Sequence, residues 1–207
     1  MTEERSLKNL LFSISTLEDL REVLSSRSHF QENIRMSLFS LMGSMPVSKG
    51  AIFLYNRRRR GLVLEACRGA GLPEGMRIPL TSKTAEVLRR QERIIMVARP
   101  PRGLATFLGE ASYVLDRAQT VLLVPLKFGD GLEGLISLGP RFNGEAYTES
   151  DLEILKVMAN YIAIGIHNQG LMRNLERTNR KLRKQVAENQ QLYTNLESIY
   201  NDTIKAL

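Results

Sequence analysis

The side chains that could carry out chemistry are few and far apart in this sequence. The 207-residue chain holds two histidines, His29 and His167, and a single cysteine, Cys67. A zinc site or a catalytic triad needs several such groups at a fixed spacing, and neither histidine has a companion nearby. Cys67 lies in an apolar stretch, which is typical of a small buried side chain. We therefore expect neither a catalytic residue nor a metal site in this chain.

One glycine-rich motif has the spacing of a phosphate-binding loop. Residues 129–134 read Gly-Asp-Gly-Leu-Glu-Gly, the G-x-G-x-x-G pattern of dinucleotide-binding proteins. That chemistry needs a helix directly after the glycines, so that the pyrophosphate meets the helix N-terminus. Here a strand-like apolar stretch follows, and glycine beside aspartate is typical of a tight turn. We predict a hairpin at this point rather than a nucleotide site.

The formal net charge of +7 raises the question of an acidic partner. Four basic residues are consecutive, Arg57–Arg60, between Asn56 and Gly61, where two strand-like stretches meet. That pattern predicts an exposed hairpin tip; the alternative is a contact with phosphate or with an acidic partner. Nucleic-acid interfaces usually spread positive charge over a face and interleave aromatic side chains, which this tip does not. We expect no nucleic-acid partner.

Composition also limits the class and location of the protein. Apolar residues make up 43% of the chain and charged residues 25%, which is enough apolar material for a folded core. No apolar run reaches the roughly 18–20 residues that a membrane span needs. The first ten residues do not have the layout of a signal peptide, and a single cysteine excludes an intrachain disulfide. We expect a cytoplasmic protein without membrane contact.

Hydrophobic periodicity predicts an α+β architecture with a long helix at each end. Apolar residues at spacings of three and four predict one helix over 5–25 and a second over 30–41. Short apolar runs then predict strands, four of which form two hairpins through tight turns. The predicted strands are 51–55, 62–67, 76–80, 93–97, 120–127 and 135–138, and short helices are predicted near 82–88 and 104–108.

The last helix is predicted to begin after Thr148, which forms a capping box with Asp151. It then continues to the end of the chain, which is too long for a small domain to bury. Its apolar residues recur every seven positions, as in a coiled coil. Together with the first helix it predicts a parallel homodimer, with a seam of Leu7, Leu10, Ile14, Leu17, Met172, Leu175, Asn179, Leu182, Val186, Asn189 and Leu196.

Residues 134–155 resemble the closing part of a GAF domain. The strand Gly134-Leu135-Ile136-Ser137-Leu138-Gly139 precedes a polar loop and Tyr147-Thr148-Glu149-Ser150-Asp151-Leu152, similar to the G-L-L-x-L-G and Y-[ST]-x-x-D-L patterns of that family. The order of predicted elements agrees over roughly residues 29–170. The resemblance implies a GAF-like central antiparallel sheet with the second and last helices, and the first, on one face. Segments 70–118 would cover the other face and roof a small-molecule pocket.

The resemblance also implies a non-catalytic sensory or regulatory function. GAF domains bind cyclic nucleotides, tetrapyrroles or other small ligands, and some bind none. For such a pocket we expect Phe107 and Tyr113 in the lining, and Arg99 and Arg102 as contacts for an anionic ligand. The sequence has no recognisable cyclic-nucleotide constellation and no bilin-anchoring motif at Cys67. It therefore identifies neither the ligand nor a cofactor.

The final residues, 198–207, resemble the lead-in to an HD-GYP domain, a family that hydrolyses cyclic di-GMP at a metal site. The resemblances imply three parts: a dimerisation helix (1–28), a GAF domain (29–170) and a signalling coiled coil (171–207) that leads to an output domain. A diguanylate cyclase, phosphatase or kinase output stays open. Two other functions also stay open: an enzyme that uses the GAF pocket, and a nucleic-acid module that uses Arg57–Arg60.

Overall fold

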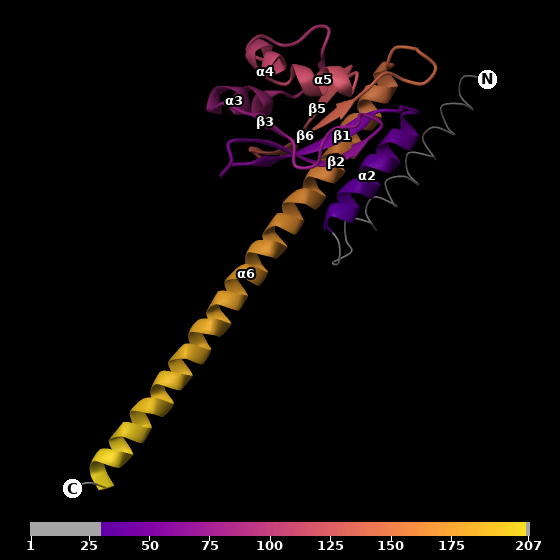
Figure 1. Ribbon diagram of the computed structural model, residues 1–207. Helices are drawn as coiled ribbons and strands as arrows, with labels where there is room; N and C mark the ends of the chain where they lie inside the picture. Colours follow the sequence, from indigo (N-terminus) through magenta and orange to yellow (C-terminus); the bar gives the residue numbers. More distant parts are fainter. Residues whose placement is uncertain (1–29, 206–207) are drawn as a thin grey trace. The chain divides into compact units, whose positions relative to one another are not determined.

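The computed structural model describes residues 30–205, with side chains described for residues 30–195 (Figure 1). The predicted first helix, with Leu7, Leu10, Ile14 and Leu17, lies outside the described residues, as does His29. The chain divides into two compact units, and the boundary falls between His167 and Asn168. The predicted division into three functional parts stays a prediction.

The first unit is built on a six-stranded antiparallel sheet, which confirms the predicted fold class. The strand order is β3-β2-β1-β6-β5-β4, so the two hairpins β1–β2 and β5–β6 meet at the centre through β1 and β6. The shortest strands, β3 and β4, form the two edges. The strands are β1 (Gly50–Asn56), β2 (Gly61–Arg68), β3 (Arg77–Pro79), β4 (Ile95–Met96), β5 (Leu122–Phe128) and β6 (Gly131–Leu138).

Two helices cover one face of this sheet, as predicted: α2 (Phe30–Ser44) and the first part of α6 (Glu149–Lys205) (Figure 1). Successive side chains of a strand point to opposite faces, so alternate strand residues such as Val124 and Leu126 pack against these helices. The apolar stripes of both helices complete one buried core, to which they contribute Ile34, Leu38, Leu41, Leu155, Met158, Ile162 and Ile166.

Three short helices cover the opposite face: α3 (Ser82–Arg90), α4 (Ala105–Glu110) and α5 (Ser112–Arg117). They bury a second apolar core on the sheet, which includes Phe53, Leu62, Leu88, Leu104, Phe107, Val114, Leu123 and Leu135. The side chain of Thr81 caps α3 by accepting a hydrogen bond from the Thr84 backbone at 3.1 Å. Segments 70–118 therefore lie where the sequence placed them.

Helix α5 differs from the prediction, which placed only one short helix in this region. Its N-cap is Ala111, which forms no side-chain cap hydrogen bond, so the sequence carries no local start signal. Val114 and Leu115 are both buried in the second core. Tertiary packing rather than local sequence thus stabilises this helix.

Both tight turns of the central hairpins have the predicted form. Arg57–Arg60 form the exposed turn between β1 and β2. Residues 129–130 form the turn between β5 and β6, and Gly129 has a φ of +53°, which glycine adopts without strain. Gly134 serves close packing instead, because a Cβ at this position would clash with the carbonyl oxygen of Phe53 on β1. The glycine-rich motif is a hairpin, as predicted.

The predicted capping box at the start of α6 is present. The Asp151 backbone N–H donates to the Thr148 hydroxyl at 3.2 Å, and the Thr148 backbone N–H donates to the Asp151 carboxylate at 2.8 Å. These two bonds satisfy amides that have no partner within the helix. They set the point at which the long helix begins.

The second unit consists of the later part of α6, a helix that continues without a break to Lys205. All its side chains from Leu171 to Asn195 are exposed. A search of the described residues finds no helix apolar and long enough to cross a membrane.

Candidate functional site

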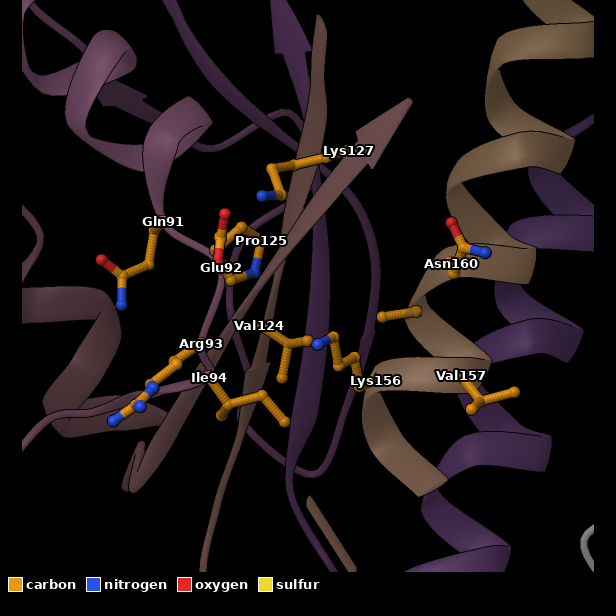
Figure 2. Close-up of a pocket in the computed structure, with 11 residues that line it drawn as sticks. Gln91, Glu92, Arg93, Ile94, Val124, Pro125, Lys127, Lys156, Val157 and Asn160 are labelled. Carbon is orange, nitrogen blue, oxygen red and sulfur yellow. The ribbon is translucent and has the colours of Figure 1, made fainter. Parts of the chain in front are cut away.

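The strongest candidate for a binding site is a cavity along strand β5. The predicted strand 93–97 is shorter in the structure, and β4 pairs only with Leu122 and Leu123. The remainder of β5 is uncovered on that side, where a cavity of about 400 Å³ lies (Figure 2). Its lining comes from the segment that leads into β4, from β5 and from α6: Gln91, Glu92, Arg93, Ile94, Val124, Pro125, Lys127, Lys156, Val157, Ala159 and Asn160.

Positive charge predominates in this cavity. Lys127, Lys156 and Arg93 line it together with a single carboxylate, that of Glu92. None of the three cations has a salt-bridge partner among the described residues. In Figure 2 the Lys156 side chain extends from α6 toward Val124 on β5, while the Arg93 guanidinium points away from it. The arrangement can hold a negatively charged group against an apolar wall.

A second groove, of about 650 Å³, lies beside β2 near the opposite edge of the sheet. Strand β3 pairs only with Gly61–Val63, which leaves the later part of β2 uncovered. Cys67 lines this groove and packs against the second core, but it is half-buried rather than buried as predicted. The charges of the groove are mixed, with Arg35 beside Glu65 and Glu74.

The four residues predicted to bind a ligand lie at different depths. Phe107 is only 1% exposed and packs in the second core, whereas Tyr113 is 53% exposed and lies under the Arg117 guanidinium. Arg99 and Arg102 are exposed on the loop before α4. Neither the cavity along β5 nor the groove beside β2 is lined by any of these four residues. Their role in ligand binding stays a prediction.

His167 lies at the end of the first unit and contacts the β5–β6 hairpin. Its Nδ1 atom is 2.9 Å from a carboxylate oxygen of Glu133, and its ring stacks on Phe128 with centroids 4.1 Å apart. No group of three or more potential metal ligands occurs among the described residues. The contact joins the hairpin to α6.

The predicted seam positions of α6 are exposed in the single chain. Met172, Leu175, Leu182 and Val186 have exposed fractions between 41% and 63%, and the polar positions Asn179 and Asn189 are exposed as well. Leu196 lies in the helix, but its side chain lies outside the described ones. A row of exposed apolar side chains at heptad spacing is unfavourable in water unless a partner covers it.

Tyr147 is buried at the base of α6 beside a partly buried ion pair. Its hydroxyl donates to the Gly139 carbonyl at 2.6 Å. The neighbouring Asp151 carboxylate accepts from Arg141 Nη1 at 2.7 Å. Burial raises the pKa of Tyr147 to about 12, an effect that Arg141 reduces and Asp151 increases. The neutral phenol is therefore the form that the folded protein stabilises.

Replacing Tyr147 with phenylalanine should change the alkaline stability profile. Below pH 9 we expect the free energy of unfolding of the variant to be about 1 kcal/mol lower than that of the wild type, because the hydroxyl's hydrogen bond to Gly139 is absent. Wild-type stability should then fall as the pH rises from 10, the pKa of an unfolded tyrosine, to about 12, the folded value. Tyr147→Phe has no ionisable hydroxyl at this position. Its free energy of unfolding should therefore rise by roughly 2 kcal/mol relative to that of the wild type over that range.

Urea unfolding at pH 8, 10 and 11.5 measures this difference in the free energy of unfolding. The other ionisable groups are common to both proteins, so their effects cancel in the comparison. A constant difference between the two proteins at all three pH values would contradict the buried, neutral assignment of Tyr147.

Sequence reasoning missed the cavity beside β5, because its lining comes from three segments far apart along the chain. One signal was present: Pro125 lies within an apolar run, and a proline in a strand is typical of a sheet edge. That residue indicated an uncovered side of β5, but not which side chains surround it.

Comparison with known proteins places this fold in one family. Residues 30–168 match the family model for the GAF domain. No protein with a curated description matches the chain.

Three similar solved structures have 14–16% identity to this chain. The GAF domain of an Acinetobacter phosphoenolpyruvate-protein phosphotransferase is 15% identical, with a TM-score of 0.56, over 76% of this chain and 94% of that one. The GAF domain of a putative sensor histidine kinase from Pseudomonas syringae pv. tomato is 14% identical (TM-score 0.57; 86% and 97% covered). A phycoerythrobilin-bound GAF domain from a cyanobacterial phytochrome is 16% identical (TM-score 0.57; 78% and 97% covered). At these identities the likeness shows the fold.

Proposed function

This chain belongs to the GAF domain family, and on that premise we propose that it is a non-catalytic regulatory module that works as a parallel homodimer. GAF domains are a sensory and regulatory fold of signalling proteins, including a chemotaxis protein and a sensor kinase among the similar structures. In this proposal the sheet domain receives a signal and helix α6 passes it on as part of a coiled coil.

The observation that carries the proposal is the change of environment along α6. Leu155, Met158 and Ile162 are fully buried in the core of the sheet domain. Further along the same unbroken helix, Leu175 and Leu182 are 63% and 56% exposed. The same helix thus contributes its first part to the domain core and, further along, an apolar seam that needs a second helix. In this proposal a change in the domain core is passed along the helix to that seam.

The polar seam residues can pair with their own copies in a parallel dimer. In a parallel coiled coil each position of this kind meets its own copy, so the two Asn179 side chains can hydrogen-bond to each other. An antiparallel pair with its midpoint between the two asparagines would instead set Asn179 against Asn189 of the other helix. We propose the parallel arrangement, and the cross-linking below tests its direction.

Disulfide cross-linking tests the dimer and its direction. In a Cys67→Ser background, Asn179→Cys should form an interchain disulfide under mild oxidation, because its two copies meet in the seam. Lys181→Cys, on the outer side of the same helix, is the matched control and should cross-link far less. Light scattering at micromolar concentration should give the mass of a dimer. Equal cross-linking at both positions, or a monomeric mass, would contradict the proposal.

The identity of the output stays a further proposal. The HD-GYP-like residues 198–207 support a cyclic di-GMP phosphodiesterase, whose catalytic groups would lie outside this sequence. A diguanylate cyclase, phosphatase or kinase output would use the same coiled coil. The regulatory role proposed for this chain is the same in each case.

A further inference from the structure

We propose that the cavity between β5, α6 and residues 91–94 binds a small organic anion, held by Lys127 and Lys156. The inference deepens the proposed regulatory function, on which it rests, because it names the chemical class of the signal and the place where it binds. This cavity differs from the pocket that the family resemblance implies, which would lie on the face of the sheet where Phe107 packs in the second core. The cavity proposed here lies at the edge of the sheet and has α6 as one wall.

Basic side chains outnumber acidic ones in the lining of the cavity. Lys127 and Lys156 approach the cavity from different elements, β5 and α6, whereas Arg93, the third basic residue of the lining, directs its guanidinium away from Val124. Glu92 is the only acidic residue in that lining, and it forms no salt bridge to any of the three among the described residues. Like charges around one cavity repel one another. An anion between the two lysines replaces that repulsion with two charge-assisted contacts.

The size and polarity of the cavity suit a small organic molecule. A volume of about 400 Å³ lies within the roughly 300–1,000 Å³ range of small-molecule sites. Ile94, Val124 and Pro125 give the cavity an apolar wall, and Asn160 adds an amide that can fix orientation. Inorganic phosphate alone would leave this apolar surface uncovered. The lining therefore favours a molecule with an acidic group and an apolar body.

The edge of β5 favours a compact ligand over an added peptide strand. Strand addition needs a continuous row of backbone donors and acceptors along an open edge. Pro125 lies in the middle of the uncovered stretch and has no backbone N–H. Prolines at sheet edges prevent such pairing.

The position of Lys156 links binding to the proposed output. Lys156 belongs to α6, directly after the buried residue Leu155. Lys127 belongs to β5, and because Val124 and Leu126 face α6, it reaches the cavity from the opposite face of the sheet across the open strand edge. An anion that contacts both lysines stabilises one position of the helix relative to the sheet. Binding would then favour one arrangement of the seam further along the same helix.

Two fluorescent probes that differ in charge test the proposal. The probe 8-anilinonaphthalene-1-sulfonate is an apolar ring system with an acidic group, and N-phenyl-1-naphthylamine has a similar body without the charge. We expect wild-type protein to bind the sulfonate more tightly than the neutral amine. Lys127→Gln with Lys156→Gln should weaken sulfonate binding by about tenfold or more, because two charged contacts are lost. Binding of the neutral probe should change little.

Matched variants separate this site from general charge effects. Lys83→Gln with Arg58→Gln removes the same charge from exposed positions outside the cavity and should leave sulfonate binding unchanged. Lys127→Arg with Lys156→Arg keeps both positive charges and should retain sulfonate binding. If wild type does not bind the sulfonate, or if the two glutamine double variants bind it equally, the proposal is overturned.

The oligomeric state separates this inference from the function on which it rests. Charge-dependent binding by a monomeric protein would sustain the anion site and refute the dimer relay. A dimer that shows no dependence on Lys127 and Lys156 would refute the anion site alone.

Discussion

Replacing Leu175 and Leu182 together with glutamate is expected to convert the dimer into a monomer. Both side chains are exposed in the single chain, and the heptad pattern assigns both to the centre of the seam. Each leucine covered by a partner contributes roughly 1.5–3 kcal/mol of apolar burial, and a dimer contains four of them. Glutamate removes that contribution and brings like charges together. We expect dimerisation to weaken by about a thousandfold or more.

Light scattering between about 1 and 100 μM measures this change in mass. The matched control is Asn174→Glu with Lys181→Glu. These two residues directly precede Leu175 and Leu182 and have the same seven-residue spacing, but they lie on the outer side of the helix. It should remain a dimer. Circular dichroism on each variant shows whether the sheet domain is still folded. Dissociation of the control to the same extent as the seam variant would contradict the assigned heptad register.

Replacing Asp151 with alanine should destabilise the sheet domain by about 2–4 kcal/mol. The Asp151 carboxylate accepts from the Thr148 backbone at 2.8 Å and from Arg141 Nη1 at 2.7 Å. Arg141 is already short of partners, because its buried Nε atom has none among the described residues. Without the carboxylate, a mostly buried guanidinium would lose its counter-charge, and the cap of α6 would lose an acceptor.

Thermal unfolding at a fixed protein concentration measures the effect, and we expect the Tm to fall by roughly 5–10 °C. Glu149→Ala is the control: it removes an acidic residue from the same first turn, but one without an ion pair to Arg141. Its effect should be within about 0.5 kcal/mol. Asp151→Asn, which keeps an oxygen for the cap, should lie between the two. Equal losses for Asp151→Ala and Glu149→Ala would refute this role of the carboxylate.

Most of the fold could be predicted from the sequence, because its signals are local. The strand pairs are joined by turns of two to four residues, and the capping box at Thr148 and Asp151 involves positions three apart. Such patterns restrict the backbone within a few residues, whatever surrounds them. The heptad pattern after Met172 is equally local. The GAF-like residues 134–155 lie in one continuous segment, so they could be identified without knowledge of the tertiary structure.

The candidate site could not be predicted in the same way. Phe107, which is predicted to line a pocket, is buried by the short helices on its face of the sheet, and its role in ligand binding stays a prediction. Helix α5 has no capping side chain and depends on that same packing. The cavity beside β5 exists because β4 begins only at Ile95, which pairs with Leu123, so Pro125 and Lys127 lie beyond the paired stretch.

Lys156 reaches the same cavity from a helix that begins about twenty residues after β5 ends. The types and order of the elements follow from interactions between near neighbours in the chain. The cavity depends on where an edge strand begins and on which helix lies nearby, and those contacts form only when distant segments pack together.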